Sequence, residues 1–361
     1  MSSPPKANEI STIPRKSKPK ARISIAPPEQ KDAKNSTISY NLLENKQLVE
    51  RIKRIHHSIK HYLDSNRGTP SVLYEAAYHL IRGGGKRLRS LLTLLACEAV
   101  NGDSEKALKV ALAAELVQTA SLISDDLIDD DDYRRGVETV HRKFGNDIAI
   151  LACNLLIGQA IRITAEVGMP ELLVQMAIGG IRMCEGEAQD IHMNLENPNK
   201  FNEDAYFEMV ANKTVAFMRQ ATLVGALIGG ASDSQIHALT SYAEALGYTF
   251  QLRDDILDIN AAPEQAPKTT YSDLRMKRGN IVVIHALAVS EENKRALCLR
   301  AMDAGDFAPI LQLIEETNSS EYTLNLAKTF NKQAKKALQG QGLALETLLI
   351  NLADYALFRT H

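Results

Sequence analysis

Two short aspartate patterns are the part of this sequence with the clearest chemistry. Asp-Asp-x-x-Asp begins at Asp125 and again at Asp254, each time within an apolar stretch of helical character. On a helix, the first and last aspartates of each copy lie one turn apart on the same face, where like charges repel. A hard cation would relieve this repulsion, and all-oxygen ligands favour Mg²⁺, which fills its octahedron with water and substrate phosphates. We therefore predict a magnesium–diphosphate site with two acidic sides. The candidate metal ligands and catalytic carboxylates are Asp125, Asp126, Asp129, Asp254, Asp255 and Asp258.

The alternative interpretation is a solvated acidic surface. Six of the eight positions from Asp125 to Asp132 are aspartate, and a single acidic run is usually a helix end in water. The second copy repeats the spacing without such a run around it, which favours the metal site.

Three basic segments could supply the cations that a diphosphate also needs. Gly83–Gly85 comes before Lys86 and Arg89 at a predicted helix start, where small residues and backbone amides favour a bound anion. An Arg-Arg pair follows the first aspartate pattern, and Lys213 lies inside an apolar stretch where an unpaired charge is costly. Each segment alone could be a basic helix start, a surface pair or a snorkelling lysine.

Composition limits the possible functions. The formal net charge is -2, so bulk electrostatics favour neither nucleic acid nor an anionic membrane as a partner. No apolar run approaches the roughly 18–20 residues of a spanning helix, so we predict no transmembrane segment. The four cysteines form no CxxC pair and are expected to be reduced thiols in a cytoplasmic protein.

The first 38 residues differ from the rest. Half of the 12 prolines lie there, together with serines and several basic residues. This composition predicts a disordered basic tail over 1–38. The tail is too polar for a secretory signal, whereas organellar targeting by it is not excluded.

The remainder, 39–361, is predicted to be one all-α domain, a single large helix bundle around a central apolar cavity. Breaks fall at the glycine cluster, at Gly168-Met169-Pro170, at Asn197-Pro198 and at 261–272. The expected helical stretches include 88–100, 107–123, 147–167, 171–190, 205–230, 234–259 and 280–290.

Together these motifs resemble those of the trans-isoprenyl diphosphate synthases, which join isopentenyl diphosphate to an allylic diphosphate head to tail. The resemblance rests on GGKRLR, DDLIDDDDYRRG, a Lys-Thr pair and FQLRDDILD, and covers about residue 40 to the C-terminus. It implies the isoprenoid synthase fold, three Mg²⁺ ions held by the six aspartates, and a homodimer. By position it implies that Arg134, Lys213, Gln251 and Lys268 contact or support the allylic diphosphate, and that Lys86, Arg89, Gln118 and Arg135 form the isopentenyl diphosphate pocket. Asp190 matches an accessory acidic position, and Thr214 and Arg278 complete the candidate substrate-binding set.

The sequence departs from the family pattern in three places. Gln118 stands where many members have histidine, but an amide can still donate to a phosphate. Cys153-Asn154 replaces a usual Gly-Asp pair. The segment 267–282 keeps Lys268 and a cation at Arg278 but lacks the usual glycines and the Thr-Leu-Pro turn.

Product length depends on the residues just before the first motif. Ser121 lies one turn before Asp125, with Ala120 beside it, and farnesyl synthases of the family tend to place an aromatic ring at one of these positions. Both side chains are small here, so we predict a product of twenty carbons or more, geranylgeranyl or longer polyprenyl diphosphate. Alternatively, Phe217 or Met218 closes the tunnel, and the product is farnesyl diphosphate.

Three other functions are alternatives to a prenyl diphosphate synthase. A terpene cyclase usually lacks the GGKRLR pocket and a full second aspartate motif. A low-activity partner subunit would have lost aspartates, and all six are present. A di-iron carboxylate bundle needs two Glu-x-x-His pairs, and only Glu138 to His141 has that spacing.

Overall fold

Helices make up nearly all of the regular structure. The computed structural model describes residues 45–193, 201–260 and 271–360. In chain order its helices are α1 Lys46–Ser65, α2 Ser71–Arg82, α3 Leu88–Ala99, α4 Ser104–Ile128, α5 Val140–Phe144, α6 Asn146–Ala165, α7 Pro170–His192, α8 Glu203–Val210, α9 Ala216–Ile228, α10 Asp233–Asn260, α11 Ser272–Met276, α12 Ile281–Val289, α13 Glu292–Asp303, α14 Ala308–Glu316, α15 Ser319–Leu338 and α16 Glu346–Phe358. A π-helical turn, Ala211–Val215, joins α8 to α9, and strands β1 (Tyr133–Arg134) and β2 (Val137–Glu138) form an antiparallel hairpin.

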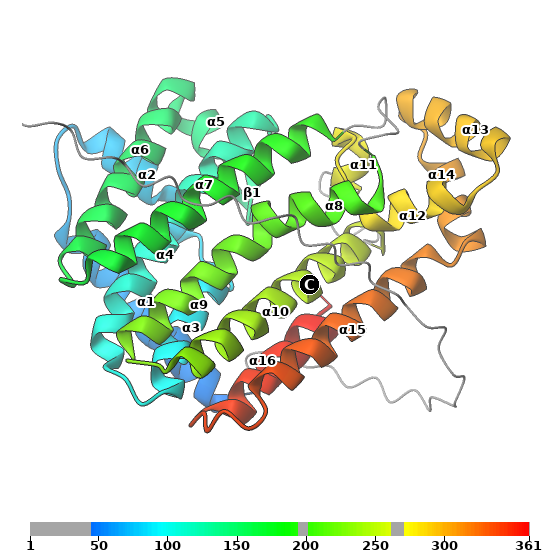
Figure 1. Ribbon diagram of the computed structural model, residues 1–361. Coiled ribbons are helices and arrows are strands. Elements are labelled where there is room, and N and C mark those ends of the chain that lie inside the picture. The colour runs from blue at the N-terminus through cyan, green and yellow to red at the C-terminus, as the bar shows by residue number, and fades with distance from the viewer. Residues whose placement is uncertain (1–44, 194–200, 261–270, 361) are drawn as a thin grey trace, which may run out of the picture. The chain divides into compact units, whose positions relative to one another are not determined.

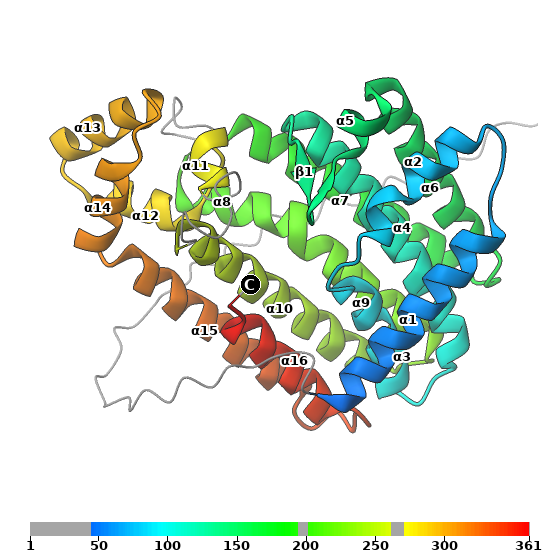
Figure 2. The same cartoon turned by 180° about the vertical axis from the view of Figure 1, so that it is seen from behind.

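The long helices α4, α9 and α10 form the interior of the bundle. Helix α4 packs against α3 and α6, α9 against α3, α7 and α10, and α10 against α15 and α16. Figures 1 and 2 show α10 running alongside α15, with α7 and α9 on its other side. Such helices are apolar on several faces because neighbours cover them on several sides. The predicted all-α bundle is therefore confirmed, whereas its central cavity stays a prediction.

Close contact between α3 and α9 fixes the helix that carries Arg89 against the helix that follows the Lys213 turn. A Cβ on Gly225 would lie 2.1 Å from the carbonyl oxygen of Thr93, so only glycine fits there. The Thr93 hydroxyl also donates to the carbonyl of Ala221 over 2.9 Å.

The predicted single helix 205–230 is wrong in one respect. Helix α8, the π-helical turn and α9 follow one another there, so one extra residue is accommodated within the helical path. Because this turn contains Lys213 and Thr214, the irregularity lies where the sequence predicted chemistry.

Two helices are long and apolar enough to cross a membrane by length and composition, α4 and α6. This differs from the prediction that no apolar run approaches the length of a spanning helix. The two helices pack against each other, and most of the apolar stretch of α4 is buried inside the bundle. Core helices pass the same test, so this is weak evidence for a span. The predicted tail, 1–38, lies outside the described residues.

Candidate active site

The first aspartate motif ends helix α4. Asp129 caps the helix, and its backbone amide donates to the carbonyl of Asp125 over 2.8 Å. Asp126 is completely buried and accepts a hydrogen bond from Arg134. Burial, followed by the nearby carboxylate of Glu187, raises the pKa of Asp125 to about 7. The motif thus uses its middle aspartate to bind the protein and its outer two to face a shared space.

A tight hairpin places the arginines that follow the motif. Strands β1 and β2 are joined by Arg135 and Gly136, whose φ angles are +54° and +79°. Two positive φ angles give the twist that a two-residue hairpin needs. Arg134 is thereby turned towards Asp126, while Arg135 donates to the carbonyl of Gly84 in the glycine-rich loop.

Two acidic residues of α7 face the first motif. Glu187 and Asp190 lie 2.7 and 2.6 Å from Lys213 Nζ. Although burial opposes it, the charges of Asp190 and Glu187 raise the pKa of Lys213 above its usual range. Arg278 lies between Asp190, at 3.4 Å, and Asp129, with which it forms an ion pair. Asp190 therefore lies where the resemblance predicted an accessory acid, whereas sequence reasoning missed Glu187, three positions earlier on the same helix face.

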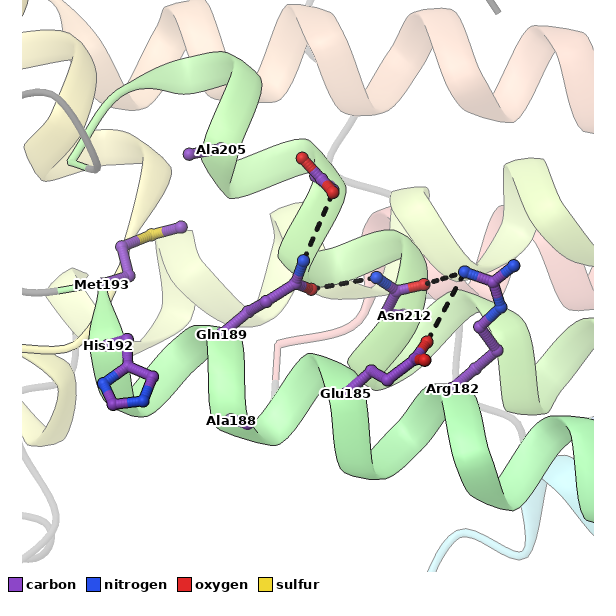
Figure 3. Close-up of a pocket in the computed structure, with 9 residues that line it drawn as sticks. Arg182, Glu185, Ala188, Gln189, His192, Met193, Ala205 and Asn212 are labelled. Atoms are coloured by element: carbon purple, nitrogen blue, oxygen red, sulfur yellow. Dashed lines mark hydrogen bonds and ion pairs between the residues drawn. The ribbon is translucent and has the colours of Figure 1, made fainter. Parts of the chain in front are cut away.

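The π-helical turn that carries Lys213 is held from its outer side. A Cβ on Gly186 would lie 2.1 Å from the backbone nitrogen of Lys213, so glycine permits the close approach of α7. Asn212 donates to Gln189 over 2.9 Å, and Gln189 donates to Glu208 over 3.4 Å. Figure 3 shows these side chains lining a surface pocket of about 670 Å³ between α7 and α8. None of the six aspartates lines this pocket, so we assign it to the outer wall and not to the active site.

The second aspartate motif lies within α10. Asp255 is 2% exposed and accepts hydrogen bonds from the Tyr206 hydroxyl at 2.7 Å and the Ile281 amide at 3.0 Å. Burial raises the pKa of Asp255 above its usual range. Gln251 donates to Asp255 over 2.9 Å and accepts from Thr214 over 2.9 Å. The predicted pair Thr214 and Gln251 thus connects the π-helical turn to the second motif.

Two predicted cations of the isopentenyl diphosphate pocket lie beside aromatic rings. Lys86 lies 5.6 Å from the centre of the Phe250 ring, and the Arg89 guanidinium lies 5.3 Å from that of Phe217. Part of Arg89 reaches solvent, but dense packing around it lowers its pKa to about 10, so the side chain stays charged at neutral pH. Gln118 is half-buried, and its Oε1 has no hydrogen-bond partner among the described residues.

Arg359, immediately after α16, is a residue that sequence reasoning missed. Its guanidinium lies 3.9 Å from the centre of the Phe250 ring and 2.5 Å from an oxygen of Asp254. The side chain is 1% exposed, yet Nε and Nη1 have no hydrogen-bond partner in the described part of the chain. After burial, the charge of Arg359 is the largest cause that lowers the pKa of Lys86. No sequence signal links position 359 to the distant position 86.

The carboxylates have the donor chemistry of a magnesium site. All candidate ligands are oxygens, as Mg²⁺ prefers. Arginines now take up part of their charge, since Arg134, Arg278 and Arg359 each pair with one of the six candidate aspartates. Among the described residues, no three His, Cys, Asp or Glu side chains already form a coordination group. Metal binding to Asp129 or Asp254 would therefore have to compete with an arginine.

The remaining predicted residues divide into three groups. Ser121 is half-buried one turn before Asp125, whereas Ala120 is buried and its carbonyl accepts from Cys153 over 3.4 Å. Asp258 lies near the C-terminal end of α10 and accepts a hydrogen bond from the backbone amide of Asp273 over 3.3 Å. Lys268 lies outside the described residues.

Comparison with known proteins agrees with this geometry. Residues 70–314 match the sequence model of the Polyprenyl synthetase family. A short chain isoprenyl diphosphate synthase of Methanothermobacter thermautotrophicus is 36% identical over 302 residues, covering 81% of this chain and 92% of that protein. A geranylgeranyl diphosphate synthase of Methanosarcina mazei is 35% identical over 302 residues, covering 81% and 91%.

Solved structures give the same result. A polyprenyl synthase from Caulobacter crescentus, crystallised with calcium and isoprenyl diphosphate, superimposes with a TM-score of 0.80 at 28% identity. The match covers 90% of this chain and 99% of that one. The fold is therefore the isoprenoid synthase fold that the motifs predicted. Because the family model and these relatives match most of its length, the chain belongs to the polyprenyl synthetase family of prenyltransferases.

Proposed function

We propose that this protein joins isopentenyl diphosphate to an allylic prenyl diphosphate, head to tail, with Mg²⁺ as cofactor. The observation that carries the proposal is the division of charge in the site. The first motif lies beside the acids of α7 and two cations, Lys213 and Arg278. Lys86 and Arg89 lie beside Phe250 and Phe217, where Asp254 of the second motif acts on both cations. Two diphosphates with different roles need such a division.

The acidic side would hold the allylic diphosphate. Three Mg²⁺ ions held by Asp125, Asp129 and the second motif would neutralise this diphosphate and favour its departure. Lys213 and Arg278 are already held there by Glu187 and Asp190, so both can meet a phosphate without large movement. Asp126 and Asp255 have protein partners, and we assign them to the support of the metal ligands.

The basic side would hold isopentenyl diphosphate. Lys86, Arg89 and the amide nitrogen of Gln118 would donate to its diphosphate, whereas Gln118 Oε1, which has no hydrogen-bond partner among the described residues, can only accept. The double bond attacks the allylic cation, and the departed diphosphate takes the proton that is lost. The carbonyl oxygens of the π-helical turn and Gln251 stabilise the cation.

The product is expected to contain twenty carbons or more. Ser121 is small and only partly buried, so no ring closes the space one turn below Asp125. Phe217, which could close the tunnel instead, lies beside Arg89 in the predicted isopentenyl diphosphate pocket. A farnesyl diphosphate synthase, or a low-activity partner subunit, is the second candidate.

A homodimer completes the proposal, and an exposed apolar surface supports it. Helices α6 and α7 pack side by side and expose one apolar stripe each. The stripes consist of Ile150, Ile157 and Ile161 on α6 and Val174, Ile178 and Ile181 on α7, all exposed. Contiguous apolar patches of this kind mark protein interfaces. Light scattering should give twice the chain mass, and Ile161→Glu with Ile181→Glu should yield monomers. The enzyme is proposed to act in the cytoplasm.

Product analysis tests the proposed reaction. The purified protein is incubated with isopentenyl diphosphate and either a shorter allylic primer or farnesyl diphosphate, with Mg²⁺ or with EDTA, and the products are separated by chain length. We expect products of twenty carbons or more that disappear with EDTA and return with Mg²⁺. A dominant fifteen-carbon product from a shorter primer would favour the farnesyl alternative, and no product at all would favour the silent subunit.

A further inference from the structure

The arginine between Lys86 and Arg89 does not belong to the same pocket as its neighbours. Arg87 has a φ of +52° and precedes the first residue of α3. Its side chain is 3% exposed, and its Nη2 donates to the carbonyl of Ile81 over 2.6 Å, at the end of α2. Lys86 and Arg89 instead lie beside Phe250 and Phe217. Within one short basic run, the middle cation is therefore withdrawn into the protein.

One carboxylate receives this buried charge. Glu115, on α4, is 5% exposed and forms an ion pair with Arg87 Nη1. Its second oxygen lies 2.9 Å from the hydroxyl of Ser90, on the first turn of α3. Glu115 thus ties the loop before α3, and α3 itself, to the helix that carries Gln118 and the first aspartate motif.

The local charge balance shows what this carboxylate does. Lys86, Arg89 and Arg135 also lie around the loop, and Glu115 acts on the pKa of both Arg89 and Arg135. Burying Arg87 without a counter-ion would cost several kcal/mol, so the ion pair is a condition for its inward orientation. If Arg87 turned outwards, it would add a second guanidinium beside Lys86 and shift the start of α3.

We propose that Glu115 is a positioning residue of the isopentenyl diphosphate pocket. Its carboxylate draws Arg87 inwards, so that Lys86 and Arg89 point to the diphosphate. Ser90 assists by orienting the carboxylate. The proposal rests on the proposed function, in which Lys86 and Arg89 bind isopentenyl diphosphate.

The test measures isopentenyl diphosphate binding by calorimetry without allylic primer, so that no reaction occurs, together with both Michaelis constants. For Glu115→Gln we expect the affinity for isopentenyl diphosphate to fall about tenfold, which corresponds to 1.4 kcal/mol. The Michaelis constant for the allylic substrate should change less than about twofold, because Glu115 touches none of the metal-binding side. Ser90→Ala should give a smaller loss of about threefold, at the low end of the range of a typical intramolecular hydrogen bond, because Ser90 only orients the carboxylate.

A double variant separates positioning from stability. Arg87→Met with Glu115→Leu replaces the buried ion pair by apolar side chains of similar size, an exchange that is often neutral for folding. We expect its melting temperature to match the wild type and its affinity for isopentenyl diphosphate to regain the tenfold lost in Glu115→Gln, because no guanidinium is left at position 87 to turn outwards. An affinity that stays about tenfold reduced in this variant would mean that the orientation of Arg87 is not the cause, and would overturn the proposal.

Two further variants complete the experiment. Glu98→Gln breaks the pairs of Glu98 with Arg51 and Arg54 at the other end of α3, and should leave both substrate affinities unchanged. Arg89→Ala tests the underlying assignment. If Arg89→Ala leaves isopentenyl diphosphate binding intact, the proposed pocket is wrong. If Arg89→Ala weakens binding but Glu115→Gln and Ser90→Ala do not, only the role of Glu115 is wrong.

Discussion

The two aspartate motifs have the same spacing but different surroundings. One turn before the first motif stands Ser121, and one turn before the second stands Phe250. Ser121 is small and half-buried, whereas the Phe250 ring lies beside two cations, Lys86 and Arg359. In the proposed function the first motif would leave space for a hydrocarbon chain, and the second would border the cationic pocket.

The middle aspartates differ as well. Asp126 is anchored by a local hairpin through Arg134, which is 28% exposed. Asp255 is anchored by groups from α8 and α12, Tyr206 and Ile281, which are buried. The second motif is thus built into the core, while the first depends on a surface element.

The largest expected effect tests what the two motifs share. Asp125→Ala and Asp254→Ala should each lower turnover by about a thousandfold or more, since each removes a charge needed when the diphosphate departs. The helical circular dichroism signal should stay unchanged. Wild-type turnover in either variant would contradict the two-sided site.

The next prediction concerns stability. Asp255→Ala leaves the Tyr206 hydroxyl and the Ile281 amide buried without an acceptor, which should cost about 2–4 kcal/mol. Asp126→Ala should cost less, because water can reach Arg134. Urea denaturation of the metal-free protein measures both. Equal losses would remove the distinction between a core motif and a surface motif.

Arg359→Ala should have an intermediate effect on one substrate. Loss of this cation should weaken isopentenyl diphosphate binding about tenfold, the range of a hydrogen bond to a charged group. Binding of Mg²⁺ should become tighter, because Asp254 would no longer be paired with an arginine. Lys335→Ala, which removes another ion pair of α16, with Asp354, is the matched control. A purely structural Arg359 would change neither affinity.

The smallest effect on rate, but a clear one on product, is expected at Ser121. Ser121→Phe should shorten the dominant product by at least one five-carbon unit, because the ring would fill the partly open position. Ala120→Phe should do the same, at a greater cost in stability, since Ala120 is buried against α6. If neither substitution changes the chain-length profile, the space for the product lies elsewhere.

The sequence predicted the fold and the site to different depths. Helices such as 234–259 and 280–290 differ from α10 and α12 by one residue at most at each end, because long apolar periodicity is a strong signal. The charge of Asp125 acts on Lys213, whereas the metal site formed jointly by the six aspartates stays a prediction. Arg359 and Glu115 could not be predicted, since their partners are distant in sequence and a single Arg or Glu has no pattern. The hairpin at Arg135 was missed because its turn lacks the usual Asn-Gly or Asp-Gly pair.

The π-helical turn has a consequence for how this segment can change in length. A π-helical turn rotates the chain less per residue than the about 100° of an α-helix, so Ala211–Val215 takes up one extra residue while α8 and α9 keep their phase. Deleting one residue there would restore a regular helix and leave Tyr206 and Phe217 in the core. The side chains within the turn would change direction, so Lys213 could no longer reach Asp190. Substitutions in this segment change one side chain at a time, whereas a deletion would move Lys213 and Thr214, and with them contacts to both halves of the site, together.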